Sequence, residues 1–357
     1  MLEQNDVPLA GLTTMRVGGP AARLVTVTTT DELVDAVREV DDADEPLLVL
    51  SGGSNLVVGD EGFAGTVVRV ATSGITPESG DYCGGAVVRV AAGESWDGFV
   101  EHAVGQGWAG VEALSGIPGL TGATPVQNVG AYGQEVSQTI AQVRTYDRHD
   151  QVVRTFFNAD CEFTYRHSLF KGDSRFVVLD VVFQLEIADL GRPVAYQALA
   201  DGLGVPLGGR APLADVRDAV LEQRRRRGMV LDDDDPDTWS CGSFFTNPLL
   251  SEAQYDALAM RAADRLGQDG PTPPRFTDRP GRVKTSAAWL IEHAGFGKGF
   301  GMPAPAALST KHTLAVTNRG GASAADVVAL ARQVRDGVLE TFGVRLVNEP
   351  VLLGTEL

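Results

Sequence analysis

The feature that most constrains this chain of 357 residues is a stretch from Ser115 to Gly133 in which seven of 19 residues are glycine or proline. Hydroxyl and amide side chains fill half of the remaining positions. Such a composition suits neither a helix nor a sheet, because glycine costs backbone entropy and proline removes a hydrogen-bond donor. A loop this long inside a compact domain is usually functional. We therefore expect a fold built around a long ligand-binding loop.

Length and charge narrow the class of protein. The chain is long enough for two or three domains, and 43% hydrophobic with 22% charged residues is typical of a soluble globular protein. A net charge of −17 repels phosphate backbones, so we expect no nucleic-acid partner. Small phosphorylated ligands remain possible, because local cations and backbone N–H groups can still bind an anion.

The three cysteines and the hydropathy profile indicate the cellular compartment in which we expect the protein. Cys83, Cys161 and Cys241 have no CxxC spacing and leave one thiol over, so we expect a reducing environment and no metal site. The chain opens with no basic-then-apolar leader, and no apolar run reaches about 18 residues. We expect a cytoplasmic protein with no membrane insertion.

The alternation of short apolar runs with an amphipathic helix predicts an α+β or α/β unit at the start of the chain, and the sequence shows no internal repeat. Predicted strands are 22–27, 47–50, 66–70, 86–92 and 176–185, and predicted helices are 30–40, 95–105, 213–226, 285–294 and 324–342. The acidic run Asp232–Asp235 reads as an exposed connection. The segment Gly295–Gly301 mimics a dinucleotide motif, but it follows a predicted helix, so we interpret it as a helix end and turn.

Two further segments could carry chemistry. Ser51–Asn55 follows a predicted strand and exposes consecutive backbone N–H groups, as an anion-binding loop does. It lacks the lysine of a P-loop and the spacing of a Rossmann motif, and a plain turn between strands is an alternative. In Cys241–Pro248, Ser243 stands between a glycine and two aromatic residues and could transfer a proton. The alternative there is a turn into a buried strand.

Five pieces in this order resemble the UDP-N-acetylenolpyruvoylglucosamine reductase (MurB) family, in its tyrosine-bearing first type. The pieces are Ser51–Asn55, Ser115–Gly133, Tyr165–Ser168, Gly242–Pro248 and Asn348–Pro350, and the likeness covers roughly residues 10–354. It implies an α+β fold: a two-subdomain FAD-binding fold of the vanillyl-alcohol oxidase/PCMH type plus a separate α+β substrate-binding domain. The expected boundaries are 1–72 with 345–357 for the first subdomain, 73–235 for the second, and 236–344 for the substrate domain.

The resemblance also implies the cofactor and its contacts. The expected FAD-binding residues are Gly52, Gly53, Ser54, Asn55, Ser115, Gly116, Pro118, Gly122, Thr124, Gln127, Asn128, Gly130 and Ala131. Many relatives of this fold attach the flavin covalently through a histidine in the first glycine loop. Ser54 stands there in this chain, and no histidine precedes His102. We therefore expect noncovalent FAD, with NADPH as the hydride donor.

In the family's reaction, NADPH reduces FAD, and the enolpyruvyl group of a UDP-linked sugar then takes hydride to become a lactyl ether. This serves peptidoglycan precursor synthesis, and hence cell wall formation, cell shape and cell division. The developing enolate needs stabilising groups at its carboxylate and one proton donor at the adjacent carbon. By resemblance, Arg166 and Glu349 stabilise and Ser243 donates the proton. Glu349 would need a raised pKa to help. Without the resemblance, Arg166 and Glu349 would read as surface charges.

The implied substrate-binding residues are Tyr196, Arg227, Asn247, Lys284 and His312. Arg227 departs from the family pattern, which commonly has lysine there, and arginine is not a neutral replacement. Arg224–Arg226 fit a solvated basic helix end equally well. The expected partners are therefore the UDP-sugar and NADPH, and we expect a monomer. Two alternatives remain: an FAD-dependent oxidase of the same fold, and a flavin-binding protein without turnover. Neither alternative needs a trio that protonates an enolate.

Overall fold

The computed structural model describes residues 1–81, 83–279 and 281–357, and the chain folds into two compact units. Unit 1 comprises Met1–Val7, Pro20–Gly53 and Phe63–Val230, and unit 2 comprises Pro8–Gly19, Ser54–Gly62 and Leu231–Leu357. The chain therefore passes between the units four times before residue 64 and once more after Val230. The three-part domain division expected from the sequence stays a prediction, and its boundaries differ from those of the two units.

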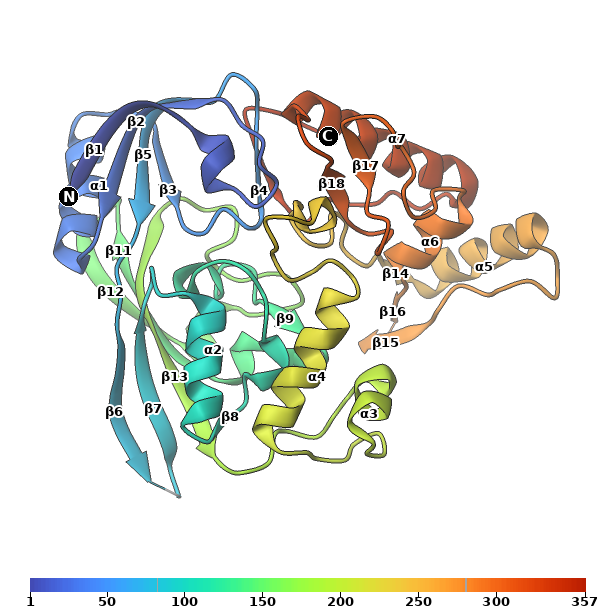
Figure 1. The fold of residues 1–357 in the computed structure, drawn as a ribbon, viewed down its shortest axis with the longest axis horizontal. Helices are drawn as coiled ribbons and strands as arrows, with labels where there is room; N and C mark the ends of the chain where they lie inside the picture. Colours follow the sequence, from blue (N-terminus) through green and yellow to red (C-terminus); the bar gives the residue numbers. More distant parts are fainter. Residues whose placement is uncertain (82, 280) are drawn as a thin grey trace. The chain divides into compact units, whose positions relative to one another are not determined.

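The first sheet of unit 1 has the strand order β1-β2-β5-β3. Its members are β1 (Leu2–Pro8), β2 (Pro20–Val27), β3 (Leu47–Leu50) and β5 (Phe63–Val70). Both β2 and β3 run parallel to β5, and helix α1 (Thr30–Asp42) connects them and packs on the same strands (Figure 1). Thr29 caps this helix by accepting a hydrogen bond from the Glu32 N–H, which satisfies one of the free donors of the first turn.

The second sheet of unit 1 is antiparallel, with the order β12-β11-β13-β7-β6 and with β8 paired to the end of β13. The strands are β6 (Ile75–Asp81), β7 (Gly85–Ala91), β8 (Trp108–Ala109), β11 (Ile140–Asp147), β12 (Val152–Phe157) and β13 (Phe176–Ile187). The long strand β13 is apolar and buried because it lies at the centre of the sheet. Its one buried carboxylate, Asp180, is neutralised across the sheet by Arg89 and Arg144.

Three helices and several short turns complete unit 1 (Figure 1). The helices are α2 (Trp96–Gly105), α3 (Gln197–Leu203) and α4 (Leu213–Arg225), and α4 packs against both others. Trp96 and Phe99 of α2 stack on Phe183 of β13 with ring centroids 5.9 and 4.9 Å apart. The 3-10 turn η2 (Glu112–Leu114) leads into the long loop. The loop contains the 3-10 turn η3 (Thr121–Ala123) and ends in the hairpin of β9 (Gly130–Ala131) and β10 (Gln134–Glu135).

Unit 2 joins three small sheets to helices α5 (Glu252–Leu266), α6 (Ala287–His293) and α7 (Ala324–Phe342). The sheets are β4 (Leu56–Val58) with β19 (Val351–Leu353), β14 (Leu249–Ser251) with β16 (Arg282–Lys284) and β15 (Phe276–Arg279), and β17 (Ala306–Leu308) with β18 (Val316–Asn318). Helix α7 supplies the largest share of the buried core and begins with a capping box between Ser323 and Asp326.

The predicted elements are confirmed, with end shifts of a few residues. Helix α7 matches its predicted range, and the Ser95 side chain caps α2 as its position suggested. Helix α6 ends at His293, and Gly295 takes a positive φ of 102°, which confirms a helix end and turn there. Residues 232–234 are exposed, as expected of a connection. No helix in the described part of the chain is both long and apolar enough to cross a bilayer.

Candidate functional site

The first glycine loop and the long loop approach each other backbone to backbone. Strand β3 ends at Leu50, and the loop opens at its carboxyl end, where parallel sheets usually bind ligands. A Cβ on Gly52 would lie 2.6 Å from the Cα of Gly119, so only glycine permits this approach. The Ser51 Oγ is buried and has no hydrogen-bond partner among residues 1–81, 83–279 and 281–357. A buried hydroxyl without a partner is costly unless a ligand satisfies it.

An ion pair fixes the start of the long loop. The Gly116 N–H donates to Asp97 Oδ1 at 2.6 Å, and Arg217 donates to both oxygens of the same carboxylate at 2.7 and 3.0 Å. Burial acts to raise the pKa of Asp97, but the hydrogen bonds from Arg217 and Gly116 lower it below its usual value. Asp97 therefore stays ionised at neutral pH and holds the loop to α2.

Local hydrogen bonds and packing contacts hold the other expected flavin-binding residues of this loop in place. The Ser115 hydroxyl donates to Glu112 O at 2.7 Å, and the Thr124 hydroxyl donates to Thr121 O at 2.8 Å. Gly122 packs on Ala92, where a Cβ would come within 2.5 Å of the Ala92 Cβ. Pro118 and Gln127 are half-buried, and Gly130 and Ala131 form β9. Their contacts with FAD stay predictions.

Arg166 lies at the tip of a tight turn that packs on the long loop. Thr164 and His167 pair through both backbone hydrogen bonds, 3.0 and 3.1 Å long, and Arg166 takes a left-handed φ of 53°. Its guanidinium donates to Gly130 O at 2.7 Å, and the Lys171 ammonium donates to Arg166 O at 2.9 Å. Residues held in an unfavourable conformation cluster at functional sites. The conformation of this turn is therefore consistent with a functional role for the Arg166 guanidinium, which stays a prediction.

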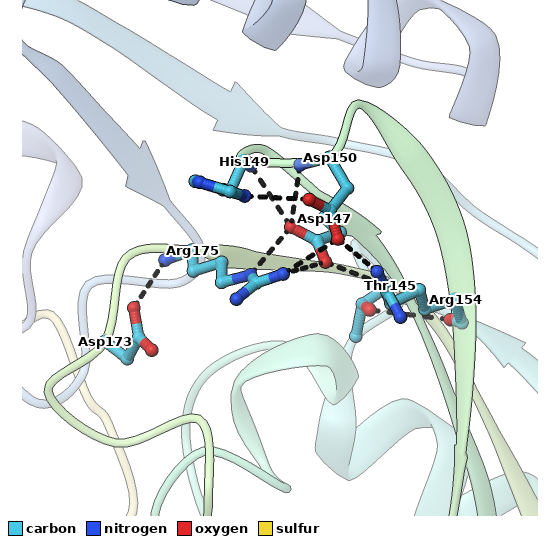
Figure 2. A network of polar contacts seen from close by, with 7 residues as sticks. All are labelled: Thr145, Asp147, His149, Asp150, Arg154, Asp173 and Arg175. Carbon is cyan, nitrogen blue, oxygen red and sulfur yellow. Dashed lines mark hydrogen bonds and ion pairs between the residues drawn. The ribbon is translucent and has the colours of Figure 1, made fainter.

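A charged network fixes the far end of the segment that carries Arg166 (Figure 2). Asp147, with no exposed side-chain surface, accepts from Arg175 Nε at 2.8 Å and Nη2 at 2.7 Å, and it also pairs with Arg154. The backbone N–H groups of His149 and Asp150 donate to the same carboxylate. The hydrogen bonds from Arg175 contribute most to lowering the pKa of Asp147 far below its usual value.

Tyr196 and Arg227, two of the expected substrate-binding residues, both contact Tyr132, which the sequence analysis did not single out. The rings of Tyr196 and Tyr132 form a T-shaped pair with centroids 5.9 Å apart, and Arg227 Nη1 donates to the Tyr132 hydroxyl at 3.3 Å. Tyr196 is 53% exposed. Tyr132 belongs to the long loop, so its place between Ala131 and Gly133 was the only available signal. The three residues present aromatic and cationic groups suited to a nucleotide.

Arg224, which lies three residues before Arg227 in the sequence, has an unusual environment. Its Nε is buried without a hydrogen-bond partner in the described residues, while its Nη2 donates to Met229 O at 2.7 Å. A Cβ on Gly116 would lie 3.4 Å from that Nε. Burial lowers the pKa of Arg224 to about 10, and it therefore remains charged at neutral pH. A half-buried cation whose buried Nε has no partner in the described residues, next to the long loop, favours an anionic ligand.

A cavity of about 170 Å³ lies beside the same cluster. Tyr132, Gly133, Arg192 and Val194 line it, together with the buried carboxylate of Glu112. Glu112 accepts hydrogen bonds from the Gly110 N–H, the Arg192 N–H and the Gln134 side chain at 2.6–2.8 Å. It ties together the start of the long loop, the β9–β10 hairpin and the segment that leads to Tyr196.

In unit 2, the backbone brings Ser243 and Glu349 to the same place. The segment after Ser243 pairs antiparallel with residues 347–349: the Glu349 N–H donates to Phe244 O at 2.9 Å, and the Thr246 N–H donates to Val347 O at 3.0 Å. Gly242, just before Ser243, takes a positive φ of 71°. Both Ser243 and Glu349 are half-buried.

Asn55 joins this pair. Its Nδ2 donates to Glu349 O at 3.3 Å, and its own carbonyl accepts from the Val351 N–H at 3.0 Å, where β19 begins beside β4. Ser54 and Asn55 therefore belong to unit 2, whereas Gly52 and Gly53 belong to unit 1. One expected flavin-binding residue and two expected catalytic residues thus lie together within unit 2.

The other expected substrate-binding residues surround the same segment. Asn247 Oδ1 accepts from the Ala287 N–H at 3.0 Å at the start of α6, and Lys284 in β16 pairs with Leu249 of β14. His312 lies in a turn that ends near Leu314, whose carbonyl accepts from the Phe244 N–H at 2.8 Å. Asp237 secures this turn through the Thr310 N–H at 2.8 Å and through Arg319 at 2.7 Å.

Cys241 is not a competing reactive group. Its thiol is buried and donates to Leu56 O at 3.4 Å, and burial raises its pKa to about 12. At neutral pH the thiol is therefore protonated and unreactive. Ser243, two residues further on, carries a half-buried hydroxyl, and its role in proton transfer stays a prediction.

The two units carry different polar groups. Unit 1 has closely approaching glycine loops, the buried Ser51 hydroxyl without a hydrogen-bond partner in the described residues, and the half-buried Arg224 cation, all of which suit a dinucleotide with a diphosphate. The donor set of unit 1 therefore fits FAD. Unit 2 has the hydroxyl of Ser243 and the carboxylate of Glu349 on two paired segments.

Comparison with known proteins identifies the relatives of this chain. Residues 234–353 match the family described as UDP-N-acetylenolpyruvoylglucosamine reductase, C-terminal domain, and residues 21–155 match the FAD binding domain family. A UDP-N-acetylenolpyruvoylglucosamine reductase of Thermobifida fusca is 58% identical over 99% of this chain and 98% of its own length. The protein of the same name from Streptomyces avermitilis is 56% identical over 99% of this chain and 96% of its own length.

A solved structure supports the fold. The crystal structure of UDP-N-acetylenolpyruvylglucosamine reductase (MurB) from Thermus caldophilus superposes with a TM-score of 0.65 at 26% identity and covers 99% of this chain and 100% of that one. The resemblance, the α+β fold class and the FAD-binding domain expected from the sequence are thereby confirmed.

Proposed function

The chain belongs to the UDP-N-acetylenolpyruvoylglucosamine reductase family, and on that premise we propose that it uses NADPH to reduce the enolpyruvyl group of UDP-N-acetylglucosamine enolpyruvate, giving UDP-N-acetylmuramate. We further propose that it acts as a cytoplasmic monomer in peptidoglycan precursor synthesis, with the UDP-sugar and NADPH as its partners. The observation that carries the proposal is the pairing of residues 244–246 with 347–349, because it brings Ser243 and Glu349 together.

FAD supplies the hydride when it is bound and reduced. Ser51, Gly52, Gly53 and the long loop would hold its diphosphate and ring, because they offer backbone donors and one unpartnered hydroxyl. Ser54 cannot form the covalent histidine linkage of some flavoproteins, which supports noncovalent binding.

Side chains of the protein then stabilise the developing negative charge and supply one proton. The Arg166 guanidinium suits the substrate carboxylate, because a planar fork pairs with two carboxylate oxygens. As hydride adds to the terminal vinyl carbon, the π electrons move toward the carboxylate. The Ser243 Oγ–H gives its proton to the adjacent carbon, which forms the second new C–H bond. A protonated Glu349 would donate a hydrogen bond to the enolate oxygen.

Tyr196, Tyr132 and Arg227 support binding of the uridine diphosphate part. An exposed tyrosine edge-on to a second tyrosine offers a stacking surface, and Arg227 lies close enough to contact that second ring's hydroxyl. Asn247, Lys284 and His312 are the proposed substrate-binding residues of unit 2. Spending binding energy on this remote part of the substrate helps to orient its reacting end.

An anaerobic experiment tests the function. NADPH should bleach the bound flavin, and UDP-N-acetylglucosamine enolpyruvate should restore its absorbance in the absence of oxygen. Restoration by oxygen alone, with no response to the UDP-sugar, would indicate an oxidase instead. No bleaching by NADPH would indicate a flavin-binding protein without turnover.

A further inference from the structure

Asn128 connects the long loop to the turn that carries Arg166. Its side chain is 1% exposed, and its Nδ2 donates to Glu135 Oε2 at 3.0 Å and to Thr164 O at 3.1 Å. Its Oδ1 accepts from the Ser137 N–H at 3.1 Å. Both donors of the amide are therefore used inside the protein, together with one lone pair of its oxygen.

The link between the two segments is reciprocal. Asn128 donates to the carbonyl of Thr164 on the turn, and Arg166 Nη1 lies 3.5 Å from the carbonyl of Asn128 while its Nη2 donates to Gly130 O. Asn128 takes a positive φ of 48°, which asparagine tolerates better than most residues. Arg166 takes a positive φ as well, so the surrounding contacts must hold it in place.

We propose that Asn128 is a positioning residue, whose side chain holds Arg166 for the substrate carboxylate and does not bind FAD. The proposal rests on the function given above, in which Arg166 meets that carboxylate. The family resemblance placed Asn128 among the flavin-binding residues, but its amide donors already have protein partners. Lys171 supports the same turn from the other side through the Arg166 carbonyl.

Loss of the Asn128 amide should affect the half-reaction with the UDP-sugar and spare the half-reaction with NADPH. Without the amide, the Thr164 carbonyl and the Glu135 carboxylate lose a donor, and the turn is freed to shift. A displacement of about 1 Å at a catalytic group can lower a rate by roughly 100-fold. Flavin reduction by NADPH does not use the guanidinium for a carboxylate, so that half-reaction should be spared.

The test variant is Asn128→Gly, because glycine keeps the positive φ and adds no charge. The matched control is Asn158→Ala, since Asn158 Nδ2 also donates two hydrogen bonds, to Ser137 O at 2.7 Å and Ile140 O at 2.8 Å, without touching the turn. Rates of both half-reactions and the Kd of FAD for the apoprotein are measured for each variant.

We expect Asn128→Gly to slow reoxidation by the UDP-sugar by roughly 10- to 100-fold. The NADPH rate and the FAD Kd should stay within about threefold of the parent values, a change of less than about 0.7 kcal/mol. Asn158→Ala should change neither half-reaction selectively. A loss of FAD affinity above tenfold, or equal loss in both half-reactions, would overturn the proposal.

A double-mutant cycle separates positioning from general destabilisation. In an Arg166→Lys background, Asn128→Gly should cause little further loss of reoxidation, because both changes act on one group. Additive losses in rate would count against the proposal. If the parent protein is not reoxidised by the UDP-sugar, the proposed function fails. A crystal structure of Asn128→Gly then decides the positioning, and an unmoved Arg166 guanidinium refutes it.

Discussion

The Glu349 N–H donates to the Phe244 carbonyl at 2.9 Å, which places Glu349 beside Ser243. This bond belongs to an antiparallel pairing between two segments that are remote in sequence. Backbone pairing does not depend on side-chain identity at either catalytic position. Substituting Ser243 or Glu349 should therefore leave the pairing intact and change chemistry more than folding.

The bound flavin should be released by denaturation. Ser54 stands where a covalent linkage would require histidine, and serine cannot form that bond. We expect acid or heat to precipitate a colourless polypeptide and leave FAD in the supernatant, measured by its absorbance and fluorescence. Yellow colour retained by the washed precipitate would contradict noncovalent binding.

Gly52→Ala should weaken FAD binding strongly. The new Cβ would meet the Gly119 backbone at 2.6 Å, and backbone cannot move aside as a side-chain tip can. Overpacking of this kind typically costs about 1–3 kcal/mol, so the Kd of FAD should rise by roughly tenfold or more and Tm should fall. Gly105→Ala is the control, because nothing lies within 4 Å of its Cβ position at the end of α2. Equal FAD affinity in the two variants would contradict this account.

Much of the fold was predictable because local patterns and tertiary packing agree. Strand β3 is a short apolar run, and helix α1 has acidic residues in its first turn and buried residues at helical spacing. Several elements were not predicted. Strand β12 exposes most of its side chains, and β1 is mostly polar, so neither shows the alternation that marks a half-buried strand. These two strands form because they pair with β2 and β11, respectively.

The candidate site was predictable only residue by residue through the family resemblance. Spacing does not show that Asn55 and Glu349 share a hydrogen bond, because their strands pair across nearly the whole chain. Tyr132 was missed because a tyrosine between small residues has no distinctive pattern. Asn128 was assigned by position, and only its hydrogen bonds show that its amide is already used.

Tyr196→Ala should impair use of the UDP-sugar alone. The ring is 53% exposed and contacts Tyr132 edge-on, so its loss should change stability by less than about 0.5 kcal/mol. We expect KM for the UDP-sugar to rise roughly tenfold, since base–aromatic stacking is worth about 1–3 kcal/mol. Leu207→Ala provides a control at a similarly exposed side chain of the same unit. A matching loss in the NADPH half-reaction would show that Tyr196 supports the flavin.

Asp147→Asn should remove a pH-dependent part of the stability. The pKa of Asp147 is lower in the folded protein than in the unfolded chain, where it is about 3.9. The carboxylate therefore stabilises the fold above that pH, and the contribution is lost as pH falls through the folded pKa. At pH 7 the variant should lose about 1–3 kcal/mol, because charged hydrogen bonds to Arg175 and Arg154 are removed. The difference in Tm should shrink below about pH 4, and a constant difference from pH 7 to pH 3 would argue against it.

Ser243→Ala gives the sharpest test of the proton donor. FAD binding and reduction by NADPH need no proton from this hydroxyl, so both should stay close to normal. Reoxidation by the UDP-sugar should collapse, because hydride addition would leave an enolate with no acid to quench it. General acid catalysis is typically worth roughly 10²–10⁴-fold, and exclusion of water should place the loss near the upper end.

Two comparisons make the Ser243 result specific. Ser243→Cys keeps a proton donor of similar volume and should recover part of the lost rate, limited by the larger sulfur and its different pKa. Thr246→Val removes a hydroxyl from the same segment, one that donates to Val347 O at 3.3 Å, and should reoxidise nearly as fast as the parent. If Ser243→Ala also reoxidises within a few-fold of the parent, the proton comes from another group. The glycine-serine turn would then line the substrate site without taking part in the chemistry.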